Sequence, residues 1–399
     1  MSQTVFMLLR RNAGNKHIET IHYKTIITNG IIIIQTTNGD RKMSDIIIKG
    51  RSANHEVRFF AAYTKELVEK SRTIHNTSPI CTAALGRLLT AGAMMGTMAK
   101  NESDMLTLII EGNGPARKLT VTADSKGNVK GLINTPVVDL PPNLEGHLNV
   151  GDAIGDGFLR VIRDAGLKEP YIGQTNLVTG EIAEDLTYYF ATSEQSPTSV
   201  GLGVLMNADN TVAEAGGFII QLMPFASDDT ITKIEKGLAS FSSVTDYLSG
   251  NTADTHGASG NIRFLNQAYD GTDKTGGNHA GNAASDSNAR SAQNKGINNS
   301  VAASIVNGTG LDLTPDDTII IEKLASMVNS IISDGVTVDE AIPAAYSCNC
   351  SRERVKKALI SVGKKELQSM INDGQPVNLH CEFCNTDYTF SIDELKSLL

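Results

Sequence analysis

The chain has 399 residues, of which 40% are hydrophobic and 20% charged, and 35 basic against 44 acidic residues give a net charge of −9. This length predicts two or three domains with a sizeable core. The acidic balance argues against a protein that coats nucleic acid, because phosphate contacts need a basic face. No stretch reaches the roughly 18 uninterrupted apolar residues of a membrane span, so we expect a soluble protein.

Residues 1–42 differ in composition from the rest of the chain. They carry six Lys or Arg against two acidic residues and have no clear amphipathic period. Their apolar run is too short and too far from the start for a secretory signal. We expect Met43 to be the natural start of the protein, and an organelle-targeting peptide is the alternative.

The segment 43–249 has the apolar patterns and capping signals of a mixed α+β core domain. In chain order we expect strands at 45–49 and 55–62, helices at 64–72 and from Pro79 to about 100, strands across 105–139, a hairpin over 157–178, a helix at 181–193, strands from Pro197 and at 215–223, and a helix from Asp228. The second helix is rich in Ala, Leu and Met, which indicates a buried packing helix. It carries Cys81, which we expect to be buried and to take no part in the chemistry.

Residues 250–313 are dominated by Asn, Gly, Ala, Ser, Asp and Thr, with few large apolar side chains. Such a segment buries too little apolar area to offset the entropy lost on ordering, so we expect a disordered insertion. Helical spacing resumes at Thr314, a capping residue followed by proline in the first turn. We therefore predict a helical linker over 314–345.

Four of the five cysteines lie in the last stretch, as CNC at Cys348 and Cys350 and CEFC at Cys381 and Cys384. Four thiolates in two close pairs can surround one tetrahedral Zn²⁺. The sequence therefore predicts a small zinc-binding domain over 346–399, with two helices between the pairs. The single-residue spacing of CNC is tighter than a two-residue knuckle, which favours a site built to come apart.

The cysteine spacing alone leaves several functions open. The spacing is as consistent with a purely structural zinc site, in a domain too small to be stabilised by its core alone, as with a redox role. A zinc ribbon that binds nucleic acid or a protein partner is a rival, but residues 348–399 hold seven basic and seven acidic side chains, so the basic face is missing. A thiol–disulfide oxidoreductase is disfavoured because CEFC follows no βαβ pattern. No catalytic motif is found, and we assign no catalytic residues and expect no enzyme.

Several longer motifs carry a specific resemblance. The tail motifs CNCSRERV and HCEFCNTDYTF are similar to those of the redox-regulated 33 kDa chaperonin family of heat-shock holdases. The segments TSPICTAALGRLLTAGAMMGTM, GEIAEDLTYYFATSEQSP and AGGFIIQLMP resemble the core of the same family. The resemblance covers about 43–248 and 314–399, with its motifs in the family's order.

The resemblance implies a cytoplasmic holdase that works without ATP and has no nucleic-acid or membrane partner. In such a protein the four cysteines bind one zinc ion when reduced. Oxidation then forms the disulfides Cys348–Cys350 and Cys381–Cys384 and releases the zinc. The small domain and the linker unfold, and exposed apolar surface holds unfolding client proteins, typically in a homodimer. The insertion at 250–313 falls at that linker, where the sequence departs from the family's pattern. It either leaves the oxidation-driven unfolding intact or weakens the inhibition of the reduced protein.

Overall fold

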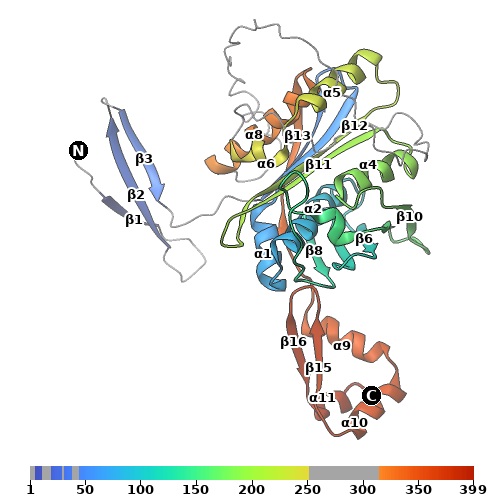
Figure 1. The fold of residues 1–399 in the computed structure, drawn as a ribbon. Coiled ribbons are helices and arrows are strands. Elements are labelled where there is room, and N and C mark those ends of the chain that lie inside the picture. Colours follow the sequence, from blue (N-terminus) through green and yellow to red (C-terminus); the bar gives the residue numbers. More distant parts are fainter. Residues whose placement is uncertain (1–4, 11–18, 29–30, 38–44, 251–313) are drawn as a thin grey trace, which may run out of the picture. The chain divides into compact units, whose positions relative to one another are not determined.

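The computed structural model describes residues 5–10, 19–28, 31–37, 45–250 and 314–399 (Figure 1). Residues 1–43 form a unit separate from residues 44–399. Its described part is an antiparallel sheet in the order β1 (Val5–Arg10), β2 (Glu19–Thr28) and β3 (Ile31–Thr37). The two interpretations of this segment stay predictions, and the expected disordered insertion lies outside the described residues.

The described residues of the second unit confirm the mixed α+β fold. Its elements are β4 (Ile46–Ser52), β5 (Val57–Tyr63), α1 (Lys65–His75), α2 (Pro79–Gly96), β6 (Met105–Gly112), β7 (Lys118–Asp124), β8 (Asn128–Ile133), α3 (Val150–Ile154), β9 (Gly157–Asp164), β10 (Tyr171–Asn176), α4 (Ala183–Thr192), β11 (Thr198–Met206), β12 (Val212–Leu222), α5 (Asp228–Ser240), α6 (Val244–Ser249), α8 (Pro315–Ile332), β13 (Val336–Pro343), β14 (Ala345–Tyr346), α9 (Arg352–Ser361), α10 (Lys364–Asn372), β15 (Val377–Cys381), β16 (Thr386–Phe390) and α11 (Ile392–Lys396). Each element predicted between 45 and 240 is found, with bounds shifted by a few residues. Among the described residues, no helix is long and apolar enough to cross a membrane.

Helix α2 lies between two sheets and is buried along almost its whole length. A six-stranded sheet has the order β10-β9-β6-β7-β8-β14, a five-stranded sheet has the order β11-β12-β5-β4-β13, and α2 contacts strands of both. Two glycines make this close approach possible. A Cβ at Gly86 would lie 2.9 Å from Val204 of β11, and one at Gly92 would lie 2.6 Å from Val121 of β7. Cys81 is buried in this helix, as predicted, and burial raises the pKa of its thiol.

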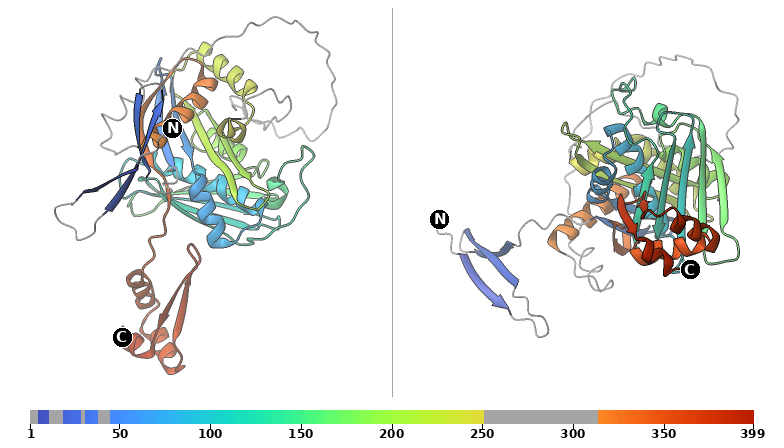
Figure 2. Two further views of the ribbon diagram at one scale, coloured as in Figure 1. Left: turned by 90° about the vertical axis from the view of Figure 1, so that its left-hand side faces the viewer. Right: turned by 90° about the horizontal axis from the view of Figure 1, so that it is seen from below.

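The other face of the five-stranded sheet is covered by α5, α6 and α8, and in Figure 1 and Figure 2 α8 and α5 lie next to each other there. Helix α8 begins where the sequence predicts, because Thr314 and Asp317 form a capping box around its first turn. Apolar side chains of α8 and of the sheet join in one buried cluster that includes Ile48, Phe59, Phe218, Leu324, Val328 and Ile331. Helix α8 therefore covers an apolar sheet surface.

The prediction of a helical linker over 314–345 is wrong for its second half. Helix α8 ends at Ile332, and β13 pairs antiparallel with β4 as the edge strand of the five-stranded sheet. A bulge between Val338 and Glu340 breaks the alternation that identifies a strand in the sequence. Strand β14 then pairs in parallel with β8 of the other sheet. The chain thus passes from one sheet to the other just before the first cysteine of the CNC motif.

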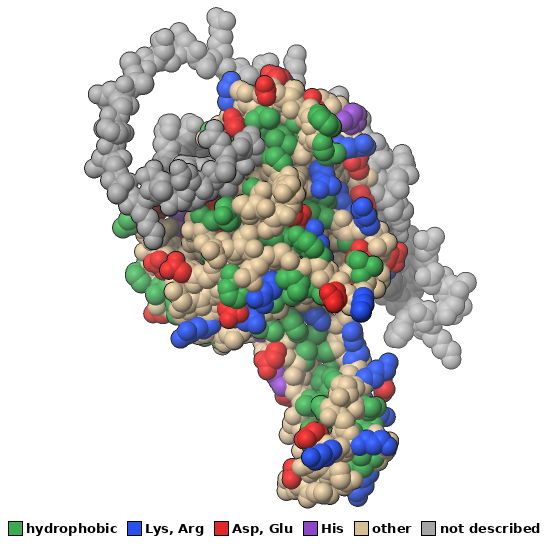
Figure 3. Space-filling model, turned by 90° about the vertical axis from the view of Figure 1, so that its right-hand side faces the viewer, with side chains coloured by type: hydrophobic (Ala, Val, Ile, Leu, Met, Phe, Trp, Pro, Cys, Tyr) green, Lys and Arg blue, Asp and Glu red, His purple; other side chains and the backbone are tan. Residues whose placement is uncertain are grey.

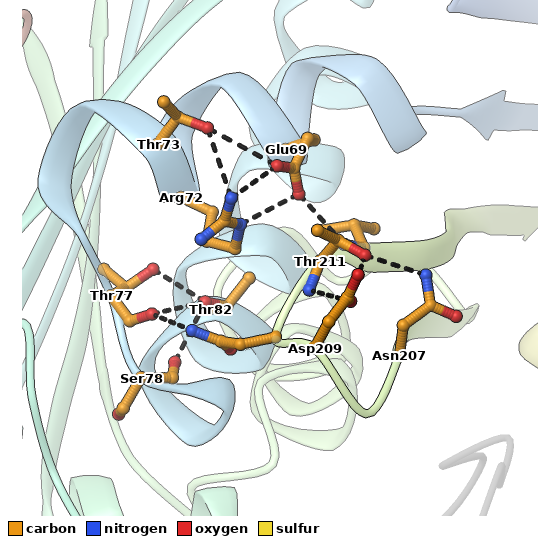
Figure 4. Close-up of polar contacts among 11 residues, drawn as sticks. Glu69, Arg72, Thr73, Thr77, Ser78, Thr82, Asn207, Asp209 and Thr211 are labelled. Atoms are coloured by element: carbon orange, nitrogen blue, oxygen red, sulfur yellow. Dashed lines mark hydrogen bonds and ion pairs between the residues drawn. The ribbon is translucent and has the colours of Figure 1, made fainter.

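Helix α1 is held against the turn between β11 and β12 by a polar network (Figure 4). The carboxylate of Glu69 accepts hydrogen bonds from the Arg72 guanidinium at 2.6 and 2.9 Å and from the Val212 backbone N–H at 2.9 Å. Burial opposes ionisation of Glu69, but these bonds outweigh it and lower its pKa. Asn210 in the turn donates to the Thr77 carbonyl at 3.2 Å. The network fixes the carboxyl end of α1, where His75 lies.

Candidate metal centre

The structure brings the four cysteines of the CNC and CEFC motifs together. Cys348 and Cys350 lie between β14 and α9, Cys381 ends β15, and Cys384 lies in the turn to β16. All four sulfur atoms lie within 4.8 Å of one another. The Sγ atoms of Cys348 and Cys381 are 3.7 Å apart, and those of Cys350 and Cys384 are 3.2 Å apart. Each motif therefore has one sulfur in close contact with a sulfur of the other motif.

The donor set fits one zinc ion. Thiolates bind Zn²⁺ at about 2.3 Å in a tetrahedron, so that ligand sulfurs lie about 3.8 Å from one another. The separations of this cluster lie close to that value, and none exceeds 4.8 Å. Cys348, Cys350, Cys381 and Cys384 can thus supply a complete Cys₄ set, which is typical of a structural rather than a catalytic zinc site.

A tight turn brings Cys384 back beside Cys381. The Cys381 carbonyl accepts hydrogen bonds from the backbone N–H groups of Cys384 at 3.2 Å and Asn385 at 2.8 Å. Asn385 has a φ of 52°, in the left-handed region that asparagine tolerates better than most residues. Phe383 lies at the tip of this turn, between the two cysteines. The two-residue spacing of CEFC is thus what the turn requires.

The pKa values of Cys348, Cys381 and Cys384 are shifted in different directions. Burial raises the pKa of Cys348 to about 12 and also raises that of Cys381. Burial acts in the same direction on Cys384, but hydrogen bonding with Thr386 and the neighbouring thiols lowers its pKa to about 7. Tyr388 donates to the Cys350 sulfur at 3.1 Å, a contact that raises the pKa of the tyrosine to about 12. Cys384 therefore ionises more readily than Cys348 and Cys381, and a bound cation favours the thiolate form of its ligands.

The domain around the cysteines has a small core of its own. Leu359, Leu367, Phe390 and Leu395 are buried together, and the first two come from α9 and α10, both of which the sequence predicts. Ser351 caps α9 by accepting from the Arg354 N–H at 3.2 Å. A core of this size rarely stabilises a fold without a metal or a disulfide. Among the contacts that sequence reasoning missed are the β15–β16 hairpin and the Tyr388 hydroxyl on Cys350.

The charge of this domain is balanced. It carries seven basic and seven acidic side chains between Cys348 and Leu399. Both kinds lie on the visible face of the lower lobe in Figure 3, coloured blue and red. This mixture agrees with the sequence-based argument against a nucleic-acid-binding zinc ribbon.

Known proteins resemble the chain over most of its length. The model of the family described as Hsp33 protein matches residues 45–261 and 302–391, which include all four clustered cysteines. A 33 kDa chaperonin of Lachnoclostridium phytofermentans is 47% identical over 357 residues, 90% of this chain and 99% of that protein. A 33 kDa chaperonin of Agathobacter rectalis is 42% identical and covers 89% and 100%. The crystal structure of a 33 kDa chaperonin from Thermotoga maritima matches with a TM-score of 0.65 at 30% identity, over 90% of this chain and 98% of that one.

These matches confirm the resemblance drawn from the tail motifs and the core segments. The agreement extends from the order of the motifs to the α+β core and the clustered cysteines. The chain therefore belongs to the Hsp33 family.

Proposed function

We propose that the chain is a redox-regulated holdase that binds unfolding proteins without ATP and prevents their aggregation under oxidative stress. The observation that carries the proposal is the convergence of four thiols within 4.8 Å, the first of them two residues beyond β14 of the six-stranded sheet. Relatives named chaperonin support the chaperone role. A reducing cytoplasm is the compartment in which such a thiol cluster stays reduced by default. As a binding protein, it needs no catalytic residues.

The proposed switch is thiol oxidation. In the reduced state the four cysteines hold one Zn²⁺. Each pair of zinc-bound thiolates then gives up two electrons to one molecule of hydrogen peroxide, which takes two protons from the solvent and becomes two molecules of water. The two resulting disulfides are no longer thiolate ligands, and the metal is released. Because metal binding supplies much of the folding free energy of so small a domain, its loss unfolds residues 348–399.

Unfolding reaches the core through the chain that precedes the cysteines. Tyr346 ends β14, and the adjoining strand β13 lies against β4 at the edge of the sheet that α8 covers. Loosening of β13 and α8 exposes the apolar surface around Ile48 and Phe59. We propose this surface as the place where unfolded clients bind. Exposed apolar surface also favours the homodimer expected for the oxidised protein.

The oxidised pairing is expected to be Cys348–Cys350 and Cys381–Cys384, although sulfurs of different motifs lie only 3.7 and 3.2 Å apart in the reduced cluster. Trypsin cleaves between the motifs, for example after Lys357. Non-reducing mass spectrometry should therefore show two separate peptides, each lighter by two hydrogens. A peptide pair joined across the motifs would contradict this pairing, and the same digest after reduction is the control.

The function itself is tested by oxidising the zinc-loaded protein with peroxide. We expect the loss of four thiols and the release of one zinc ion per chain, together with reduced light scattering from a heat-denatured client enzyme. Reduction in the presence of zinc should reverse all three changes. Equal suppression of scattering before and after oxidation would rule out the redox switch. Turnover of insulin disulfides would favour an oxidoreductase, and salt-sensitive retention on nucleic acid would favour a zinc-ribbon regulator.

A further inference from the structure

The hydroxyl group of Tyr346 touches both the core and the turn that carries two of the cysteines. Tyr346 is 3% exposed. Its oxygen lies 2.8 Å from the carbonyl oxygen of Gly131 in β8 and 2.5 Å from that of Phe383. Phe383 lies between Cys381 and Cys384. The Tyr346 side chain, two residues before Cys348, therefore bridges the six-stranded sheet and the turn that carries Cys381 and Cys384.

Helix α1 and strand β8 hold this tyrosine from the core side. The Nε2 atom of His75 lies 2.9 Å from the Gly131 carbonyl, to which it donates, and 3.2 Å from the Tyr346 hydroxyl. Lys70 donates to the Tyr346 carbonyl at 2.9 Å. Both side chains come from α1, which the Glu69 network fixes in place (Figure 4). Contacts from the core side thus fix the position of the hydroxyl.

Two further contacts join the core to the cysteine motifs. Lys130 of β8 donates to the Asn349 side-chain oxygen at 2.7 Å, and its ammonium lies 4.9 Å from the centre of the Phe383 ring. The Asn385 side chain donates to the Ile74 carbonyl at the end of α1. Asn349 lies between Cys348 and Cys350, and Asn385 follows Cys384. Both contacts therefore require the folded conformation of the cysteine motifs.

We propose that Tyr346 is a positioning residue that docks the cysteine turn onto the core, so that zinc retention and docking stabilise each other. The inference rests on the proposed function. The docking contact forms only while the cysteine turn is folded, so it stabilises the zinc-bound form. Because the two equilibria are linked, zinc binding stabilises the docking contact by the same free energy. Oxidation of the cysteines breaks these contacts and frees β14, which passes the change on to β13.

The test is the rate at which the reduced, zinc-loaded full chain gives up zinc to an excess of a chromophoric chelator. Tyr346→Phe keeps the ring and removes the bridging hydroxyl. We expect zinc release about tenfold faster than in the unchanged protein, the effect of losing about one buried hydrogen bond. Thr198→Val is the matched control, because it removes a buried hydroxyl bonded to Ser196 and Gln221 in the core. It should release zinc at the unchanged rate.

A second variant keeps the proposal testable if Tyr346→Phe fails to fold. Lys130→Met removes the charge above Phe383 and the bond to Asn349, and should speed zinc release about threefold. Unchanged release from the folded variants, or equally fast release from Thr198→Val, overturns the docking role and leaves the proposed function standing. An unchanged chain that takes up no zinc overturns both.

Discussion

Replacement of Cys381 by serine is expected to unfold residues 348–399 while the six-stranded sheet stays folded. Serine is a poor zinc ligand, and a structural zinc ion supplies on the order of 10 kcal/mol to the folding of a small domain. The small core of this domain, which has four buried side chains including Leu359 and Phe390, cannot replace that contribution. Amide hydrogen exchange in α9, α10 and the β15–β16 hairpin should accelerate by about four orders of magnitude or more. Exchange in β6, β7 and β9 should stay slow.

The chain offers a matched control in Cys81, the fifth cysteine. Cys81→Ser makes the same chemical change in α2, where the Thr135 carbonyl, 3.3 Å from the sulfur, can accept the new hydroxyl. This variant should keep one zinc ion per chain and slow exchange over 348–399. Removing zinc from the unchanged protein with a chelator under reducing conditions should reproduce the Cys381→Ser result. Slow exchange over 348–399 in the metal-free protein would contradict the assignment of zinc as the source of its stability.

Local signals in the sequence were enough to predict most elements of the core and the members of the cysteine cluster. Thr314 and Ser351 cap the helices predicted after them, because a capping side chain acts within its own first turn. The four cysteines could be selected from residue type and spacing alone. Which sulfurs of the two motifs come into contact could not be predicted, because that depends on how the CNC segment lies against the β15–β16 hairpin.

The features that the sequence did not reveal depend on distant partners. Strand β13 exists because β4 offers an open edge, and its bulge hides the alternating pattern. The role of Tyr346 depends on Gly131, 215 residues earlier, and on Phe383, 37 residues later. A single tyrosine at the end of a two-residue strand carries no periodicity, and nothing in the sequence around it indicates these contacts. Sequence reasoning therefore identified the four clustered cysteines but not their connection to the core.

A methyl group added between α5 and α8 is expected to give the reduced protein holdase activity without any oxidant. Gly237 of α5 is packed so closely on α8 that a Cβ there would lie 2.0 Å from the backbone oxygen of Ile331. Alanine is a better helix former than glycine, so Gly237→Ala should stabilise α5 itself. The destabilisation therefore falls on the contact between α5 and α8. Overpacking of this kind costs about 1 to 3 kcal/mol, enough to make detachment of α8 roughly five- to 150-fold more frequent. Hydrogen exchange in α8 should rise accordingly.

The distinguishing result is holdase activity in a chain that still carries one zinc ion. If the apolar surface under α8 binds clients, the reduced Gly237→Ala variant should suppress client aggregation while its four clustered thiols stay reduced. Lys236→Ala changes the exposed neighbouring position of the same helix and should leave the reduced protein inactive. Faster exchange in α8 without any gain of activity would place the client surface elsewhere. Activity with zinc retained would show that the cysteines control the chaperone only by holding α8 in place.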